Sequence, residues 1–483
     1  MIEGLQDRSL LRVDAHIDGD WVGSTRRTAI VNPATGATVA EVADLDRAAA
    51  RTAIVAARAA QPGWAAKTAL QRSDILRRWA ALMRENAEDL ARILTAEMGK
   101  PLAEAKGEIG FGASFLDWFA EEGRRIYGDT IPGHQPDKRL LVLKQPIGVA
   151  ASITPWNFPN AMIARKVAPA LAAGCTFVAR PSELTPLSAL AMAELGQRAG
   201  LPKGVFNVVT AADAAAIGQE FCENPTVRKL SFTGSTRVGQ ILMAQAAAGI
   251  KKLSLELGGN APFIVFDDAD LDAAVEGALI AKFRNSGQTC VCANRIYAQA
   301  GIHDAFTEKL AQRVAAMKVG DGATPGTELG PLIDLRAVEK VEAHLNDAVG
   351  LGARIVTGGN RIGDGTLFFE PTVLTGVVPA MRVSREETFG PLAAVIRFET
   401  EQEVVALAND TEFGLASYFY SSNLSRVFRV MEALEYGMVG INTGLVSTAE
   451  APFGGIKTSG LGREGSKYGI EDYLEIKYVC LSI

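Results

Sequence analysis

The sequence predicts an α/β fold with two domains, each built on a mainly parallel β-sheet. Three observations lead to this prediction. The chain has 483 residues, more than one hydrophobic core usually holds. Short apolar segments alternate with helix-like segments from about residue 147, and a second block of the same alternation starts at residue 262. Repeated strand–helix–strand units favour parallel sheets that are covered on both faces.

The N-terminal segments IDGDWV (17–22) and VNPATG (31–36) predict short strands joined by turns. One long amphipathic helix follows, because apolar residues recur every three or four positions from Ile75 to Leu94. Gly99 and Pro101 are typical of a helix end.

The alternating blocks supply the strands of the two sheets. The first block contains IGVAASI (147–153), TFVA (176–179), GVFNVV (204–209) and KLSF (229–232). The second contains PFIVF (262–266), NRIYAQ (294–299), PLAAVIRF (391–398) and GMVGIN (437–442). KRLLVLKQ (138–145) and the C-terminal YLEIKYVCLSI (473–483) alternate like exposed strands, so we expect them to pair with another subunit.

Composition excludes several classes of function. The 49 Lys and Arg residues against 55 Asp and Glu residues give a net charge of −6, which offers no basic surface for nucleic acid or an anionic membrane. The first residues lack the apolar segment of a signal peptide, and the longest apolar stretch, 167–179, is too short to span a membrane. Five scattered cysteines fit a reducing cytoplasm better than a disulfide framework.

A candidate phosphate-binding turn lies at SFTGSTRVG (231–239). Gly234 and Gly239 follow a predicted strand and open a predicted helix, where backbone N–H groups suit a pyrophosphate. The segment is neither G-x-G-x-x-G nor a Walker loop, so an ordinary strand-to-helix turn explains it equally well.

The segment RNSGQTCVCAN (284–294) places Cys290 and Cys292 two positions apart. They could be metal ligands, half of a disulfide, buried packing residues, or a nucleophile and a bystander. We expect no metal site, because the other cysteines and the four histidines are scattered. Packing alone would be the commoner explanation of such a pair.

The surroundings of these cysteines favour chemistry over packing. Glu256 lies in LSLELGGN, where an apolar segment would make its carboxyl either an unwelcome buried charge or a general base with a raised pKa. Asn157 lies in TPWNFP (154–159), between aromatic residues and prolines, and offers an amide donor to an oxyanion. Nucleophile, base and oxyanion donor form a coherent set.

Six segments identify a family. TPWNFP, FTGSTRVG, LELGGNAPFIVF, GQTC, EETFGP (386–391) and PFGGIKTSGLGREG (452–465) resemble motifs of the NAD(P)-dependent aldehyde dehydrogenase superfamily, in its order and over essentially the full chain. KFRNSGQTCVCANR and GREGSKYGIEDYLEIKY look most like the succinate-semialdehyde dehydrogenases. The resemblance implies a dinucleotide-binding domain (1–126 and 147–258), a catalytic domain (259–458), a β oligomerisation element (127–146 and 459–483), and a homodimer or homotetramer.

The resemblance also implies a mechanism. Cys290 attacks the aldehyde carbon, and the Asn157 amide and the Cys290 backbone N–H hold the oxyanion of the thiohemiacetal. Hydride transfer to a nicotinamide leaves a thioester, and Glu256 deprotonates the water that hydrolyses it. Enzymes that release the acyl group to coenzyme A can dispense with this base, so Glu256 favours hydrolysis.

Further expectations concern neighbouring residues. Lys166 and Glu464 match positions of a proton path in the family, although a structural ion pair explains them equally well. Cys292 could form a strained, reducible disulfide with Cys290 under oxidation. An inactive binding protein with this fold is disfavoured, because Cys290, Glu256 and Asn157 are all present.

The resemblance implies NAD or NADP as the cofactor. The matching positions are Thr154, Pro155, Trp156, Arg180, Ser182, Glu183, Gly234, Ser235, Gly239, Leu257, Glu387 and Phe389. A carboxylate at Glu183 would accept bonds from ribose hydroxyls and repel a 2′-phosphate, whereas Arg180, which replaces the usual lysine, is a good phosphate ligand. We favour NAD, because a like-charge contact in a partly buried site is costly.

Arg165, Arg284 and Ser447 match positions that bind the distal carboxylate in the succinate-semialdehyde enzymes. The planar fork of an arginine can bind both oxygens of a carboxylate. The sequence therefore predicts succinate semialdehyde as the substrate, with glutarate semialdehyde, 2-oxoglutarate semialdehyde or a general aldehyde as alternatives. Each arginine could instead be a structural ion-pair partner.

Overall fold

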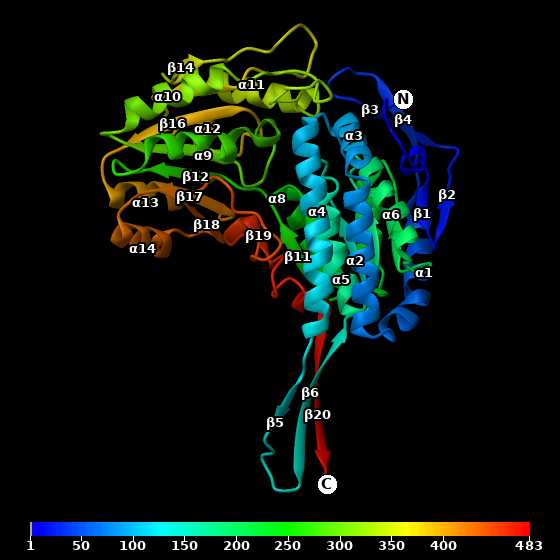
Figure 1. The fold of residues 1–483 in the computed structure, drawn as a ribbon. Helices are drawn as coiled ribbons and strands as arrows, with labels where there is room; N and C mark the ends of the chain where they lie inside the picture. The colour runs from blue at the N-terminus through cyan, green and yellow to red at the C-terminus, as the bar shows by residue number, and fades with distance from the viewer. Residues whose placement is uncertain (1) are drawn as a thin grey trace.

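Two sheets of mainly parallel strands organise the computed structural model, which describes residues 2–483 (Figure 1). The first sheet has the order β19-β11-β10-β7-β8-β9-β1-β2. Its parallel strands are β7 (Val149–Ile153), β8 (Thr176–Arg180), β9 (Phe206–Val208), β10 (Val227–Thr233) and β11 (Lys252–Glu256). Antiparallel strands at its edges are β1 (Ala15–Ile17), β2 (Asp20–Val22) and β19 (Gly460–Leu461). A separate hairpin pairs β3 (Arg27–Val31) with β4 (Thr38–Ala43).

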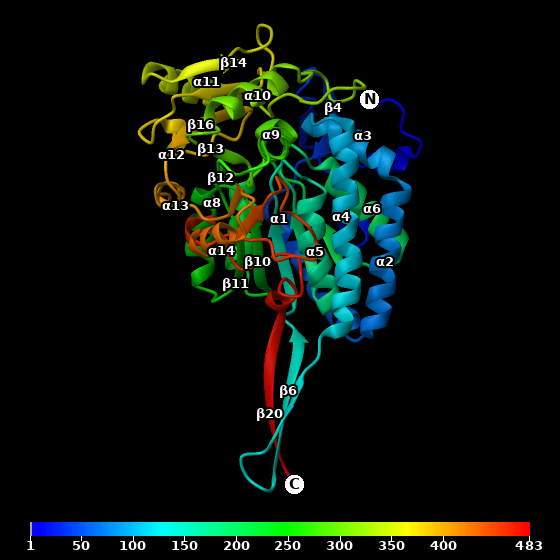
Figure 2. The ribbon, with the colours of Figure 1, turned by 60° about the vertical axis from the view of Figure 1, so that its left-hand side comes forward.

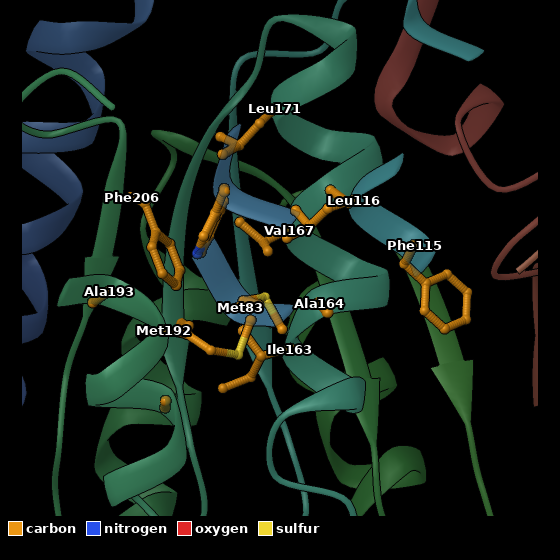
Figure 3. Close-up of a cluster of buried hydrophobic side chains, with 14 of the residues drawn as sticks. Met83, Phe115, Leu116, Ile163, Ala164, Val167, Leu171, Met192, Ala193 and Phe206 are labelled. Carbon is orange, nitrogen blue, oxygen red and sulfur yellow. The ribbon is translucent and has the colours of Figure 1, made fainter. Parts of the chain in front are cut away.

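Helices cover both faces of the first sheet. One face packs against α1 (Arg47–Ala65), α7 (Ala214–Glu223) and α8 (Thr236–Ala247). The other packs against α5 (Ala161–Ala173) and α6 (Leu187–Ala199), which α2 (Ala69–Glu85), α3 (Ala87–Met98) and α4 (Leu102–Glu122) cover in turn. Figure 3 shows this second core, in which Met83, Leu116, Val167, Met192 and Phe206 meet.

The second sheet has the order β14-β15-β16-β13-β12-β17-β18, and only its β14–β15 pair is antiparallel. Its strands are β12 (Ala261–Val265), β13 (Ala293–Gln299), β14 (Arg354–Thr357), β15 (Thr372–Thr375), β16 (Leu392–Phe398), β17 (Ala416–Tyr420) and β18 (Met438–Ile441). Its helices are α9 (Leu271–Phe283), α10 (His303–Ala315), α11 (Leu335–Gly350), α12 (Arg382–Arg385), α13 (Glu401–Asn409) and α14 (Leu424–Ala433). The predicted α/β fold with two parallel sheets is confirmed.

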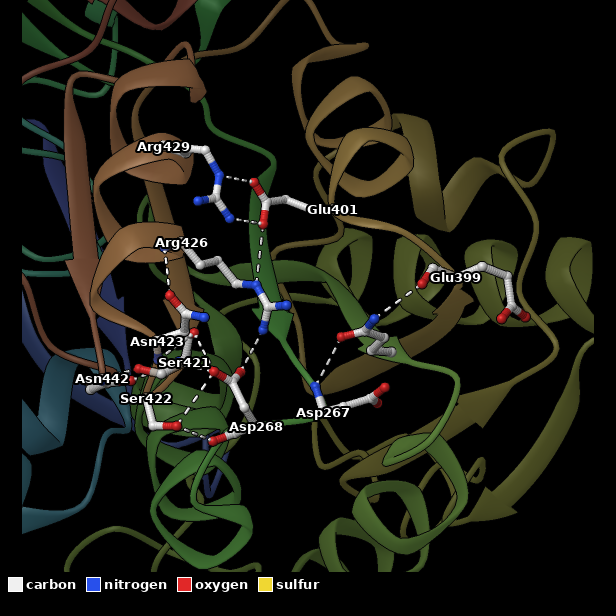
Figure 4. A network of polar contacts seen from close by, with 11 residues as sticks. Asp267, Asp268, Glu399, Glu401, Ser421, Ser422, Asn423, Arg426, Arg429 and Asn442 are labelled. Carbon is white, nitrogen blue, oxygen red and sulfur yellow. Dashed lines mark hydrogen bonds and ion pairs between the residues drawn. The ribbon is translucent and has the colours of Figure 1, made fainter.

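Ion pairs fix helix α14 at the edge of this second sheet (Figure 4). Arg426 bonds Asp268, in the turn after β12, at 2.7 Å and Glu401 of α13 at 3.2 Å. Arg429 adds a 2.8 Å contact to the same Glu401 carboxylate. The arrangement is structural, because none of these residues lines the cavity described below.

A three-stranded arm projects from the body (Figure 2). It consists of β5 (Asp129–Ile131), β6 (Lys138–Pro146) and β20 (Leu474–Ser482), with β6 in the centre. The register runs from Leu474 opposite Pro146 to Ser482 opposite Lys138. The segments predicted as exposed strands that await another subunit therefore pair with each other first. The outer face of β20 still exposes Ile476 and Tyr478, and the predicted oligomer stays a prediction.

The single long helix expected between Ile75 and Leu94 is two helices. Helix α2 ends at Glu85 and α3 begins at Ala87, because Asn86 turns the chain and its side chain donates to the Leu82 carbonyl at 2.8 Å. The predicted end is confirmed at Gly99, which caps α3 with a left-handed φ of 92°. No helix within residues 2–483 has the length and apolarity needed to cross a bilayer. The predicted domain boundaries stay predictions.

Candidate active site

A cavity of about 550 Å³ opens at the carboxyl ends of the first sheet's strands and reaches the start of α11. Such edges of parallel sheets are where ligands usually bind. Half of the site residues predicted from sequence line it: Pro155, Trp156, Asn157, Gly234, Ser235, Glu256, Leu257, Cys290, Glu387 and Phe389. The described residues contain no group of three His, Cys, Asp or Glu side chains placed to bind a metal ion.

The three predicted catalytic residues reach this cavity from separate elements. Asn157 follows β7, and Glu256 is the last residue of β11. Cys290 lies in the turn between α9 and β13, shortly after Asn285 and Ser286, whose φ angles of 53° and 56° are left-handed. This unusual backbone brings the nucleophile candidate of the second sheet against the first sheet.

Cys290 and Cys292 occupy different environments. Cys290 is half-buried and lines the cavity, and burial raises the pKa of its thiol to about 12. Cys292 is buried away from the cavity, where its Sγ lies 3.4 Å from the Nζ of the fully buried Lys282. Only Cys290 is therefore placed to meet a ligand, and as a thiol it needs a base to take its proton.

Glu256 is a buried carboxyl group in the cavity wall. Its two oxygens have no hydrogen-bond partner within residues 2–483. Burial, reinforced by the nearby Glu464 carboxylate, raises the pKa of Glu256 well above its usual value. A carboxylate in this state is a strong base for a thiol or a water molecule in the cavity.

Asn157 presents its side-chain amide at the cavity wall. Nδ2 donates to the Gln288 carbonyl at 3.0 Å, two residues before Cys290. An amide nitrogen carries two hydrogens, so one remains for a ligand oxygen. The bond to Gln288 ties the amide to the loop of the candidate nucleophile.

Glu464 forms a buried charge cluster beside Glu256. Its carboxylate makes ion pairs with Arg165 and Lys166 of α5, and Lys166 also donates to Ser231 at 3.0 Å. Burial opposes ionisation, but the two cations outweigh it and hold the pKa of Glu464 below its usual value. Neither Lys166 nor Glu464 lines the cavity. The alternative of a structural ion pair therefore describes this geometry, and the proton path stays a prediction.

The start of α8 forms a cradle that fits a dinucleotide. Gly234 and Ser235 line the cavity, and the buried hydroxyls of Thr233 and Thr236 find no protein partner in the described part of the chain. A Cβ at Gly239 would lie 2.5 Å from Leu257, so glycine permits α8 to pack closely against that residue. Free backbone N–H groups at this helix start suit a pyrophosphate.

The expected adenosine end holds an ion pair. Arg180 of β8 is buried and donates to Glu183 at 2.8 Å and to the Ala211 carbonyl at 2.9 Å. Glu183 and Ser182 line a small hollow that is separate from the main cavity. Arg180, expected to attract a 2′-phosphate, and Glu183, expected to repel it, thus form an ion pair with each other. Thr154 is buried, with its N–H bonded to the Arg180 carbonyl at 3.1 Å.

Glu387 and Phe389 close the other side of the cavity. Burial raises the pKa of Glu387 to about 7, although the Gly259 N–H donates to its carboxyl at 3.1 Å. Phe389 adopts a left-handed φ of 57°, and its ring meets the Trp156 ring edge-to-face at 5.6 Å. The aromatic pair lines the same cavity as Cys290 and makes part of its wall apolar.

The predicted substrate ligands Arg165, Arg284 and Ser447 differ in their surroundings. Arg165 is buried, stacks on Phe453 at 4.3 Å, and pairs with Glu464 through Nε, while its Nη2 has no hydrogen-bond partner within residues 2–483. Arg284 is half-buried and lies over the Phe158 ring at 5.5 Å. Ser447 is half-buried in the segment after β18. None of the three is among the cavity-lining residues.

Helix α11 also contributes to the cavity, which was not predicted from the sequence. Asp334, its N-cap, and Arg336 and Lys340 on its first turns line the cavity opposite the first sheet. Arg336 donates to Asp334 at 2.6 Å and is exposed. The capping pattern in PLIDLRAVEKVE could have predicted the helix start, but no local signal places it across from α8.

Comparisons with known proteins agree with this geometry. The model of the aldehyde dehydrogenase family matches residues 21–479. A glutarate-semialdehyde dehydrogenase from Pseudomonas aeruginosa is 64% identical and covers 99% of both chains. An NADP(+) succinate-semialdehyde dehydrogenase from Escherichia coli is 63% identical over 99% of this chain and 100% of the relative. The crystal structure of an E. coli NADP-dependent enzyme superposes with a TM-score of 0.98, at 62% identity over 99% and 100% of the two chains.

Proposed function

The chain belongs to the aldehyde dehydrogenase family, and on that premise we propose that it oxidises succinate semialdehyde to succinate. The family makes it an oxidoreductase that uses a pyridine nucleotide. The observation that carries the proposal is the meeting of Cys290, Glu256 and Asn157 in one cavity with the cradle at the start of α8.

The first chemical step forms a bond between the Cys290 sulfur and the aldehyde carbon. The thiol proton passes to a water molecule in the cavity as this bond forms, because burial raises the pKa of Cys290 to about 12 and leaves the thiol protonated. As the C–S bond forms, the carbonyl π electrons move to oxygen. The free amide hydrogen of Asn157 and the Cys290 N–H stabilise that oxyanion.

The second half of the reaction releases the acid. A nicotinamide dinucleotide held at the start of α8 would supply the hydride acceptor, and the substrate carbon would then remain on Cys290 as a thioester. Glu256 takes a proton from water, whose oxygen attacks the thioester carbon. The C–S bond then breaks, the carboxylic acid leaves, and the proton held by Glu256 returns to the Cys290 sulfur.

Arginine side chains near the cavity support an aldehyde with a distal carboxylate. Arg284 carries no ion pair among the described residues, and Arg165, which contacts Glu464 through Nε, leaves its Nη2 without a hydrogen-bond partner in the same part of the chain. Ser447 is the third proposed ligand. Glutarate semialdehyde is the second candidate, because the Pseudomonas relative carries that name and one methylene changes binding by only about 1–3 kcal/mol.

Arg284→Ala tests the substrate proposal. We expect kcat/KM for succinate semialdehyde to fall roughly 10- to 150-fold, because a charged hydrogen bond contributes about 1.5–3 kcal/mol. The rate with butanal, which has no carboxylate, should not change. Steady-state kinetics with succinate semialdehyde, glutarate semialdehyde and butanal measure both effects. Arg361→Ala, which breaks a remote pair with Glu342, is the control. Equal losses on charged and uncharged aldehydes would contradict the assignment.

For the cofactor we propose a preference for NAD over NADP. In the ion pair, the Glu183 side chain is 40% exposed and the Arg180 side chain only 4%. A 2′-phosphate on the ribose would therefore meet the carboxylate of Glu183 before the guanidinium of Arg180. We expect Glu183→Gln to raise kcat/KM with NADP roughly tenfold and leave the value with NAD within a factor of about two. Fluorescence titration of both nucleotides separates binding from catalysis. A wild-type enzyme that binds NADP more tightly would overturn the preference.

The expected homo-oligomer and cytoplasmic location also remain proposals. The projecting arm, with Ile476 and Tyr478 exposed on β20, supports assembly through β20. Sedimentation velocity measures the assembly directly, and a stable monomer at micromolar concentration would overturn the proposed oligomer.

The proposed Cys290–Cys292 disulfide competes with the contact that Lys282 makes to Cys292.

A further inference from the structure

A buried ion pair lies directly behind Asn157. Lys100 and Glu108 have 0% and 1% side-chain exposure, and Lys100 Nζ lies 2.6 Å from Glu108 Oε2. The same ammonium donates to the backbone carbonyl of Asn157 at 2.7 Å and lies 3.8 Å from the centre of the Phe158 ring. Neither charged residue lines the cavity, so neither is placed to touch a ligand.

Glu108 holds the next part of the same segment. Its second oxygen, Oε1, accepts the N–H groups of Asn160 at 2.9 Å and Ala161 at 3.2 Å, where α5 begins. One ion pair therefore fixes the backbone on both sides of Phe158. Paired buried charges often contribute little net stability. Stabilisation of the fold therefore does not by itself explain why Lys100 and Glu108 are buried here.

The loop of the candidate nucleophile meets this ion pair at the same carbonyl oxygen. Asn285 Nδ2 donates to the Asn157 carbonyl at 3.2 Å and to the Gln288 carbonyl at 3.2 Å. Glu104, one turn before Glu108 on α4, accepts the Asn285 N–H at 2.9 Å. Helix α4 and Lys100, two residues before its start, thus contact both the Asn157 segment and the Cys290 loop.

We propose that Lys100 and Glu108 are positioning residues that set where the Asn157 amide lies relative to Cys290. This inference rests on the proposed function, in which Asn157 stabilises the oxyanion. An oxyanion donor acts only within a few tenths of an ångström of its place, so a shift of the Asn157 backbone weakens the acylation step. Deacylation by Glu256 and nucleotide binding use other contacts and are unaffected.

The test removes both charges together, because a lone buried charge would unfold the site. Lys100→Met/Glu108→Gln leaves an amide oxygen to accept the two α5 N–H groups. Stopped-flow fluorescence measures the burst of reduced nucleotide with saturating succinate semialdehyde. We expect the burst rate to fall roughly 10- to 100-fold, somewhat less than the loss on removing an oxyanion donor outright. The dissociation constant of the nucleotide, measured by titration, should stay within twofold.

A double-mutant cycle with Asn157→Ala distinguishes positioning from general damage. We expect the double replacement to change the burst rate less than threefold in the Asn157→Ala background, because the amide it positions is gone. The inference would be overturned if the burst-rate losses of the double replacement and of Asn157→Ala multiply when the two are combined. A normal burst rate in Lys100→Met/Glu108→Gln would overturn it as well. If Asn157→Ala itself keeps the normal burst, the oxyanion role in the proposed function fails, and this inference with it.

Glu97→Gln is the matched control. Glu97 is equally buried and accepts the Leu187 and Ser188 N–H groups at the start of α6, as Glu108 does for α5. It should lower the thermal midpoint without slowing the burst. Should the double variant not fold, Glu108→Asp alone keeps both charges and draws the carboxylate back by one methylene from Lys100 and from the start of α5. That variant should slow the burst three- to tenfold when Asn157 is intact. It should leave the burst unchanged when Asn157→Ala is also present.

Discussion

Cys290→Ala is expected to lower the aldehyde oxidation rate by a factor of at least about 10⁴, because no thiohemiacetal can form without the nucleophile. Nucleotide binding should persist, since the cradle at the start of α8 does not depend on the thiol. Initial rates with succinate semialdehyde and a nucleotide titration measure the two properties separately.

Cys292→Ser is the control for this prediction. It lies two positions away, buried outside the cavity, and serine keeps a hydrogen-bond partner for the Lys282 ammonium. Its activity should stay within about threefold of wild type. Iodoacetamide labelling followed by peptide mapping should modify Cys290 first. If Cys290→Ala still oxidises the aldehyde and Cys292→Ser does not, the assignment of nucleophile and bystander is reversed.

Glu256→Gln is expected to lower kcat by a factor of about 10²–10⁴, the usual contribution of a general base. Acylation and hydrolysis should respond differently. An amide at this position keeps the size of the side chain but cannot take a proton from the hydrolytic water. The thioester on Cys290 should therefore accumulate, and mass spectrometry of the quenched protein should detect it.

The pH dependence follows from the raised pKa of Glu256, which has burial as its main cause and the Glu464 carboxylate as its second. At low pH the carboxyl is protonated and cannot act as a base. The rate of thioester hydrolysis should therefore rise with pH through the raised pKa and become constant above it. Single-turnover measurements across pH should lose this rise in Glu256→Gln. A rate that falls with rising pH in wild type would exclude Glu256 as the base.

Local sequence was enough to predict most strands, and three residues that it singled out for catalysis line one cavity. TPWNFP and LELGGN place Asn157 and Glu256 at the carboxyl ends of β7 and β11. Such ends share one edge of a parallel sheet, so the strand pattern brings these two groups together. Cys290 reaches them from the turn between α9 and β13 of the second sheet, which the strand pattern does not predict. The break at Asn86 was missed, because apolar periodicity continues across it from α2 into α3.

Partnerships between distant charges were decided only by the tertiary structure. Lys166 and Glu464 are 298 positions apart, and Lys100 lies 57 positions before the Asn157 carbonyl that it holds. The placement of α11 opposite α8, with Arg336 and Lys340 facing the cavity, likewise leaves no local trace. The sequence by itself determined which chemistry the chain carries, because reactivity belongs to residue types. Which charges meet depends on how the helices and loops pack over the two sheets, and no spacing along the chain sets that distance.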